Sequence, residues 1–234
     1  MNKDKVWCAS FDIGKKNFAF YIEEFDRNAL LACDNVDKAN RYNPNGTATD
    51  IFDEVLRKVC NNGKRILFVN SDLTNKCEKG SYLDPETFHN MTDLLDKYAE
   101  YWDKCLAFVI EKQMSFGKTH NTMALKLGQH CYSYFCFRYS RFKEIIEFPA
   151  YYKTQILGAH KIEKKTKKGN VSYKAMDKPT RKKWSVQKAT EILNERQDTE
   201  TISSLTNARK RDDLADCLTQ LQAWKYLVFV DKSI

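Results

Sequence analysis

The sequence predicts an α/β fold with a β-sheet of mixed strand direction. Two apolar, strand-like runs stand next to each other near the N-terminus, and helical and strand-like patterns alternate after them. The 234 residues are 42% hydrophobic and 30% charged, with only 8 Gly and 4 Pro. This composition is typical of a globular protein that buries a sizeable core, and it excludes disordered and fibrous chains.

The first two elements predict a central β-hairpin. Residues 6–13 are almost wholly apolar, as expected of a strand that is covered on both faces. Residues 18–22 are aromatic and apolar, and only the short link 14–17 separates the two runs. We therefore expect these strands to pair at the centre of the sheet.

The next segment, residues 26–64, is predicted less directly. The run 43–46, Asn-Pro-Asn-Gly, indicates a turn, and Thr49 is placed to cap an amphipathic helix that ends near Asn61. Residues 65–69 then predict a third strand.

The rest of the chain predicts two further strands and four helices. The strands are expected at 105–110 and 144–148, and the helices at 85–104, at 119–139, after Pro179 and at 211–226. We expect no internal repeat and no division into two domains.

Cellular location is predicted from what the sequence lacks. No apolar run approaches the roughly 18 to 20 residues of a membrane helix, so we expect no membrane partner. A strand-like pattern begins at Val6 and leaves no room for a leader, and the eight cysteines are scattered without a CxxC pair. These features favour an intracellular, reducing compartment without disulfides.

The positive charge is concentrated in one segment. The chain has a net charge of +8, but residues 151–183 alone carry eleven Lys and Arg against two acidic residues, a net of +9. Such a segment favours a polyanion partner, because cations on phosphates release condensed counterions. The alternative is a solvated basic loop without a partner, and we expect residues 161–178 to be flexible.

Four acidic residues interrupt or border apolar elements: Asp12, Glu111, Asp213 and Asp216. Burying a carboxylate costs several kcal/mol unless a partner neutralises it, and all-oxygen ligands select Mg²⁺ or Mn²⁺. Taken singly, these acids also fit a turn, a strand end and an acidic first turn of a helix. On the last helix, the 100° rotation per residue turns Asp213 and Asp216 toward the sheet edge and Asp212 into solvent or a supporting contact.

These motifs resemble those of RuvC-type Holliday junction resolvases, especially the branch in fungal mitochondria, poxviruses and other large DNA viruses. The similarity is carried by residues 11–17 (FDIGKKN), 110–114 (IEKQM) and 213–216 (DLAD), and also by 148–158 and 178–184. It covers most of the chain and is weakest in residues 26–64.

The resemblance implies one RNase H-like domain over residues 1–234, with a five-stranded mixed sheet, helices on both faces and an insertion at 26–64 between the second and third strands. It implies that Asp12, Glu111, Asp213 and Asp216 are catalytic ligands of Mg²⁺, for which Mn²⁺ substitutes. The implied enzyme is a homodimeric endodeoxyribonuclease that nicks four-way junctions symmetrically and leaves 5′-phosphate ends. A large DNA virus acting in an infected host cell is the implied source.

Contacts with junction DNA are expected from basic residues and from Met114, which stands near the place where RuvC inserts an aromatic side chain at the junction centre. Phe116 follows two residues later, so the identity of the inserted residue stays open. The expected contacts are Lys15, Lys16, Lys112, Met114, Lys153, Lys164, Lys165, Lys167, Lys168, Arg181, Lys182 and Lys183. For the dimer contact we expect the helix 119–139, which is rich in apolar and aromatic residues such as Phe135 and Phe137. The alternative is that this helix is simply buried.

Two other functions remain open. The first is a non-catalytic protein of the same fold that binds branched DNA. The second is an ATPase related to actin and sugar kinases, which share the opening hairpin but need a second glycine-rich phosphate loop, and none is visible.

Overall fold

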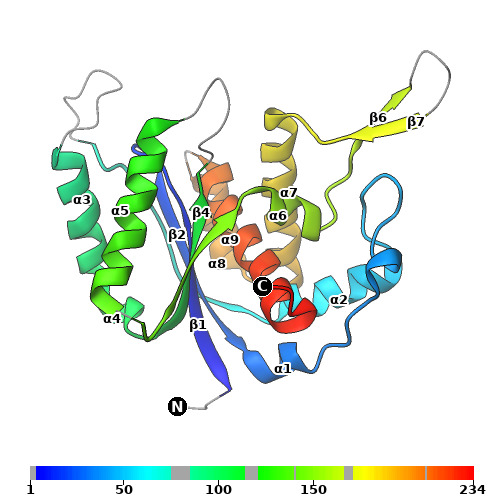
Figure 1. Cartoon of the computed structure of the whole chain (residues 1–234), viewed down its shortest axis with the longest axis horizontal. Helices are drawn as coiled ribbons and strands as arrows, with labels where there is room; N and C mark the ends of the chain where they lie inside the picture. Colours follow the sequence, from blue (N-terminus) through cyan, green and yellow to red (C-terminus); the bar gives the residue numbers. More distant parts are fainter. Residues whose placement is uncertain (1–3, 75–84, 114–120, 140, 166–170, 209) are drawn as a thin grey trace.

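The core of the molecule is a five-stranded sheet in the order β3-β2-β1-β4-β5 (Figure 1). The structure is a computed structural model that describes residues 4–74, 85–113, 121–139, 141–165, 171–208 and 210–234. The strands are β1 Lys5–Asp12, β2 Phe18–Asp26, β3 Lys64–Ser71, β4 Cys105–Lys112 and β5 Glu144–Pro149. β2 pairs antiparallel with β1 and β3, whereas β4 is parallel to β1 and β5, which confirms the predicted mixed sheet.

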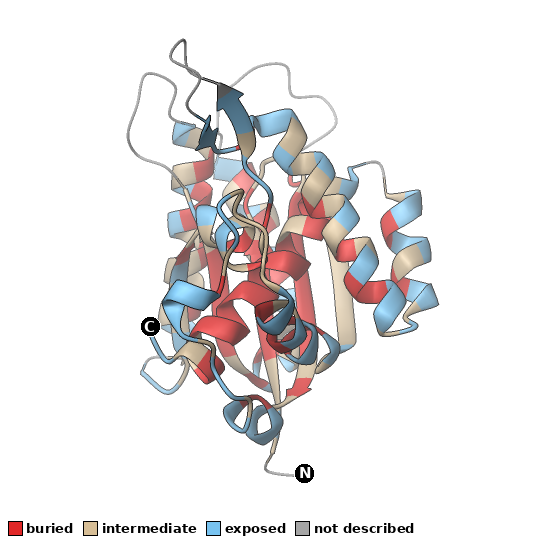
Figure 2. Ribbon diagram, turned by 90° about the vertical axis from the view of Figure 1, so that its right-hand side faces the viewer, coloured by how far each residue is buried: buried red, intermediate tan, exposed pale blue. Residues whose placement is uncertain are grey.

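Helices cover both faces of the sheet (Figure 1), as predicted. One face is covered by α3 Pro85–Lys97, α4 Ala99–Trp102 and α5 Thr122–Tyr139. The other is covered by α2 Asp50–Asn61, α6 Tyr151–Ile156, α7 Lys178–Glu195, α8 Thr199–Asn207, α9 Arg211–Lys225 and the π-helical segment η2 Tyr226–Asp231. Figure 2 shows the buried residues gathered in the sheet and in the helices against it.

The segment predicted as an insertion connects β2 with β3. It contains α1 Arg27–Leu31, the 3₁₀ turn η1 Lys38–Asn40 and α2. Thr49 caps α2 as predicted, because its hydroxyl accepts a hydrogen bond from the Phe52 amide. Phe52 and Leu56 of α2 are buried, so this segment contributes to the core rather than lying loosely on it.

The expected long helix at 85–104 is divided. α3 ends at Lys97, α4 follows after Tyr98, and Trp102 turns fully into the core. The Trp102 indole donates a hydrogen bond to the Leu95 carbonyl at 2.7 Å and packs edge-on against Phe20. The gain from burying this indole therefore outweighs the loss of helical continuity at Tyr98.

The basic segment has more structure than a loop. β6 Ile162–Lys165 pairs antiparallel with β7 Val171–Lys174 to form a two-stranded hairpin, whose connection 166–170 lies outside the described residues. The pairing provides hydrogen-bond partners for the backbone N–H and C=O groups of the two strands, whereas the β7 side chains are exposed and bury little surface. The sequence did not predict this pairing, because apolar and polar residues hardly alternate in this highly charged segment.

The aromatic residues of α5 divide between the core and the surface. Phe135 is fully buried and stacks on Phe108 with ring centroids 3.9 Å apart, so its expected role in a dimer contact is wrong. Phe137, two residues on, is 91% exposed. The seven cysteines within the described residues are free thiols, and no helix formed by these residues is long and apolar enough to cross a bilayer.

Candidate active site

Two neighbouring strand ends bring carboxylates together at one edge of the sheet. β1 and β4 run parallel with Phe11 opposite Ile110, so Asp12 and Glu111 follow at the same edge. Both line a cavity of about 360 Å³, which Asp213 and Asp216 of α9 also line. The structure therefore brings together all four acids that the sequence singled out.

A buried glutamine holds α9 against these strand ends. The Gln220 amide donates hydrogen bonds to the Ser10 hydroxyl at 3.0 Å, to the Phe11 carbonyl at 3.2 Å and to the Val109 carbonyl at 3.1 Å. These partners lie close before Asp12 on β1 and Glu111 on β4. Gln220 thus fixes the distance between the helix and both strands, a role that no sequence motif indicated.

Lys153 is the central cation of the cavity. It follows β5 on the short helix α6, is buried, and places its Nζ 3.2 Å from Glu111 Oε1 and 3.1 Å from Asp216 Oδ2. Burial opposes its charge, but the Glu111 and Asp216 carboxylates hold the pKa of Lys153 well above its ordinary value. The sequence predicted Lys153 only as a phosphate contact and gave no sign of this ion pair.

The pKa values of the neighbouring acids Asp12 and Glu111 are shifted in opposite directions. Burial, together with the charges of Glu111 and Asp216, raises the pKa of Asp12 well above its ordinary range. Burial also opposes the charge of Glu111, but Lys153 and a hydrogen bond with Asp12 outweigh it and lower the pKa of Glu111. Glu111 Oε2 also accepts a hydrogen bond from the Gln113 amide at 3.0 Å.

Asp213 has an oxygen without a hydrogen-bond partner among the described residues. This atom, Oδ2, is buried, and burial together with the charge of Asp212 raises the pKa of Asp213 to about 6. A buried carboxylate oxygen without a donor is costly and is stabilised by a cation. Asp216 is held differently, because the Ser185 hydroxyl donates to its Oδ1 at 2.6 Å.

Of the two places expected for Asp212, solvent or a supporting contact, the structure shows the supporting contact. Asp212 lines the same cavity and forms an ion pair with Lys182 of α7, which lowers the pKa of Asp212 against the opposing effect of burial. The rotation of successive residues along α9 predicted that Asp212 lies on the side of the helix that faces away from the sheet. It could not show that the start of α7 covers that side.

The donor set fits a hard divalent cation, although the carboxylates are not gathered around one point. Among the described residues, no three Asp, Glu, His or Cys side chains form a ready metal cluster, since Lys153 lies between Glu111 and Asp216. All the available donors are nevertheless oxygens, and Asp213 Oδ2 is still without a partner. A cation would be held by Asp12, Glu111, Asp213 and Asp216.

Comparison with known proteins places the chain among viral proteins. No protein-family model matches it. It is 36% identical to protein 170L of Invertebrate iridescent virus 6, over 98% of this chain and 92% of that protein. The chain belongs to the family of protein 170L. Protein 97L of Invertebrate iridescent virus 3 is 28% identical over 93% of this chain and 98% of its own length.

The fold is that of RuvC. The structure of Thermus thermophilus RuvC is similar to 95% of this chain and to 96% of its own, with a TM-score of 0.50 and 10% sequence identity. The resemblance predicted from the motifs is thereby confirmed as an RNase H-like fold of the RuvC type.

The predicted DNA contacts fall into three groups. Lys112, Lys153, Arg181 and Lys182 line the carboxylate cavity. The others with described side chains lie elsewhere: Lys15 and Lys16 between β1 and β2, Lys164 on β6, and Lys183 at another cavity. Met114, Lys167 and Lys168 lie outside the described residues, and for Lys165 only the backbone is described. Lys178 and Gln113 also line the carboxylate cavity. Both stand in motifs that carried the resemblance, but neither was singled out as a site residue, and Lys178 was expected only as part of the basic segment 153–183.

Proposed function

We propose that this protein is a structure-selective DNA endonuclease that resolves four-way junctions by metal-dependent hydrolysis of phosphodiester bonds. The observation that carries the proposal is the cavity in which four carboxylates, one with an unpartnered oxygen, lie beside several basic side chains. The RuvC-type fold agrees with this chemistry. The place of action is the infected host cell, in keeping with the viral relatives.

The chemistry divides between a cation and the residues around it. Mg²⁺, or Mn²⁺ in its place, would supply activation of water and neutralisation of charge at the scissile phosphate, with 5′-phosphate and 3′-hydroxyl products. Glu111 and Asp216 keep Lys153 protonated, so Lys153 presents a permanent positive charge to a phosphate in the cavity. Ser185 orients Asp216, and Gln220 holds the strand ends that carry Asp12 and Glu111.

The direct test compares a synthetic four-way junction with a linear duplex of the same sequence, each with Mg²⁺ and with EDTA. We expect paired nicks in the junction with Mg²⁺ only, and little cutting of the duplex. Equal cutting of both DNAs would contradict junction selectivity. Tight junction binding without cleavage in Mg²⁺ and in Mn²⁺ would favour the non-catalytic alternative.

The basic hairpin is expected to contribute to junction affinity through phosphate contacts. Replacing Lys164, Lys165, Lys167 and Lys168 with Ala should weaken binding and flatten its salt dependence. Each lost phosphate contact should lower the slope of log K against log salt by roughly 0.9. The slope is measured from binding titrations at several salt concentrations.

The matched control for the hairpin changes the same amount of charge elsewhere. Lys38, Lys58, Lys97 and Lys126 are exposed and lie on η1, α2, α3 and α5. Replacing these four with Ala should leave the salt slope near that of the unmodified protein. If both quadruple variants lower the slope equally, only net charge matters and the hairpin makes no specific phosphate contacts.

Homodimerisation is proposed because paired cuts across a near-symmetric junction need two active sites. Phe137 near the end of α5 and Phe142 just after it are 91% and 92% exposed, which suits a contact with a second copy. Replacing both with Glu should convert a dimer to a monomer, whereas Ile51→Glu on α2, also exposed, should not. Light scattering at micromolar protein, with and without junction, measures this. A monomeric unmodified protein in both conditions would rule out the dimer.

A further inference from the structure

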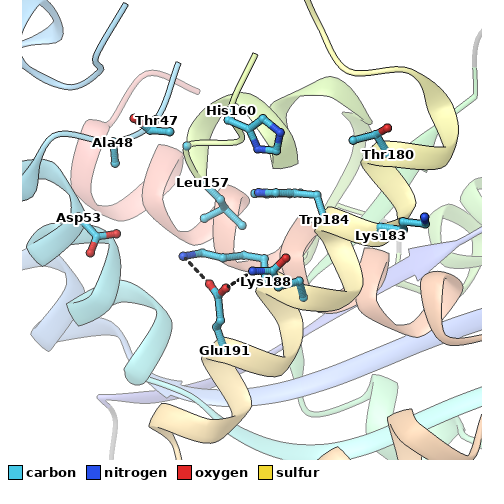
Figure 3. Close-up of a pocket in the computed structure, with 12 residues that line it drawn as sticks. Thr47, Ala48, Asp53, Leu157, His160, Thr180, Lys183, Trp184, Lys188 and Glu191 are labelled. Atoms are coloured by element: carbon cyan, nitrogen blue, oxygen red, sulfur yellow. Dashed lines mark hydrogen bonds and ion pairs between the residues drawn. The ribbon is translucent and has the colours of Figure 1, made fainter. Parts of the chain in front are cut away.

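A second cavity, of about 440 Å³, lies against α7 and is separate from the carboxylate cavity (Figure 3). It is bounded by α7, by Asp53 of α2, by Thr47 and Ala48 before α2, and by residues 157–160 after α6. None of the four acids of the candidate active site lines it. Its volume falls in the range of small-molecule sites, which is roughly 300 to 1,000 Å³.

The walls of this second cavity are held in place by backbone contacts. Gly158 has a φ of +72°, and a Cβ there would stand 2.8 Å from the Ala48 nitrogen, so only glycine allows this close approach. The Lys161 amide also donates to the Asn45 carbonyl at 2.6 Å. The loop before α2 and the turn after α6 therefore form one fixed wall, and a ligand would not need to order it.

The lining combines aromatic rings with polar groups of both charges. The Trp184 indole is half-buried, and Figure 3 shows it beneath the His160 ring and next to Leu157 in the hollow. Two lysines, Lys183 and Lys188, are balanced by Asp53 and Glu191. A site for a bare phosphate would be more positive, and a site for an alkyl chain would be less polar. The lining suits a flat ring that carries donors and acceptors on its edge.

α7 links the two cavities. Ser185 reaches Asp216 in the candidate active site, while Trp184, the preceding residue, lines the second cavity. Because an α-helix with its side chains is only about 10 Å wide, a DNA strand that crosses α7 reaches both cavities within a few nucleotides. Lys183, which is exposed on the same part of α7, lies where the backbone of such a strand would pass.

We propose that the second cavity receives an unpaired nucleobase, stacked on Trp184, from a DNA strand that crosses α7. This proposal rests on the proposed function, because the strand is taken to be DNA that leaves the carboxylate cavity. Every base has a flat aromatic face, so stacking needs no particular sequence. Lys183 lines the cavity and can contact the base edge, and the Gln187 amide, which donates to Glu191 in the structure, can do so if it exchanges that hydrogen bond for one to the base. The site would hold a nucleotide close to the cut in an unstacked conformation.

The test compares the single strand d(T)8 with the same strand in which abasic residues replace the central thymidines. Both strands carry the same phosphates, so a difference in Kd reports the bases alone. Binding is measured by fluorescence anisotropy in EDTA, and cleavage plays no part. We expect d(T)8 to bind about tenfold more tightly, since one stacked base accounts for that order of change. Equal affinities of the unmodified protein for the two strands would overturn the proposal.

Two substitutions locate the effect. Trp184→Ala should reduce d(T)8 affinity to that of the abasic strand, and Trp184→Phe should keep most of the preference. Tyr173→Ala is the matched control, because Tyr173 is an exposed aromatic residue on the basic hairpin, outside the cavity. Loss of the preference in Tyr173→Ala but not in Trp184→Ala would place base stacking on the hairpin and reject the cavity. Junction cleavage is assayed separately and tests the proposed function independently of the result of these binding measurements.

Discussion

Replacing any one of Asp12, Glu111, Asp213 or Asp216 with its amide is expected to abolish junction cleavage while junction binding survives. The loss should be at least about a thousandfold, since each change removes a charge on which cation binding and the reaction depend. Affinity should stay equal or rise, because the cavity loses negative charge that repels phosphate. Cleavage is measured by single-turnover assays in Mg²⁺ and binding by titration in EDTA.

Asp212→Asn is the matched control for the four amides. Asp212 lies on the same turn of α9 and lines the same cavity, but Lys182 already neutralises it. We expect this variant to keep substantial activity. An inactive Asp212→Asn together with an active Asp213→Asn would exchange the roles assigned to these two residues. Asp12→Asn and Asp213→Asn should not lose stability through the site, because burial and neighbouring carboxylates oppose both charges. Glu111→Gln and Asp216→Asn each remove one of the two carboxylates paired with the buried Lys153, so the stability of these variants is measured alongside their activity.

The sheet and its two strand-end acids could be predicted because local patterns determine them. A continuous apolar run such as residues 6–13 is typical of a strand buried on both faces, and the structure places β1 at the centre of the sheet. A charged residue at the end of such a run is expected at the edge of the sheet, because the core on both faces of the strand excludes an unpaired charge. Asp12 and Glu111 therefore carried a signal in the sequence, and their parallel pairing places them together.

The partners of these acids could not be predicted, because they come from distant parts of the chain. Lys153 lies 42 residues after Glu111, on a helix of six residues in a basic segment, where a lysine is usually solvated. Only the path of the chain after β5 brings it between Glu111 and Asp216. For a similar reason the sequence could not decide between solvent and a supporting contact for Asp212, since helix periodicity says nothing about α7 packing on the side of α9 that faces away from the sheet.

A second group of charges, far from the candidate active site, lies inside the core. Glu23 of β2 is fully buried and is 2.7 Å from an Arg196 nitrogen and 2.6 Å from Lys225 Nζ. The Tyr21 hydroxyl and the Gln222 amide also donate to Glu23, at 2.8 and 3.0 Å. Each of these four hydrogen-bond partners is a donor to the carboxylate, and the group ties β2 to the end of α7 and to α9.

Glu23→Gln is expected to lower the free energy of unfolding by about 3 to 5 kcal/mol, because two buried cations then face a neutral amide. Burial opposes the charge of Glu23, but Arg196 and Lys225 outweigh it and lower its pKa from 4.5 to about 2. A lowered carboxyl pKa contributes stability that is present above about pH 4.5 and is lost as the pH falls toward 2. The variant should therefore lack this part of the acid dependence. Urea unfolding at several pH values measures both effects.

Glu24→Gln provides the matched control for this prediction. Glu24 is the next residue on β2, but it is partly exposed and contacts the Trp7 indole and Lys5 near the surface. Because exposed ion pairs contribute only about 0 to 1 kcal/mol, this variant should unfold close to the unmodified protein. If Glu23→Gln and Glu24→Gln have the same urea midpoint at pH 7, the buried group adds no net stability. If Glu23→Gln is less stable but keeps the full acid dependence, another carboxylate titrates in that range.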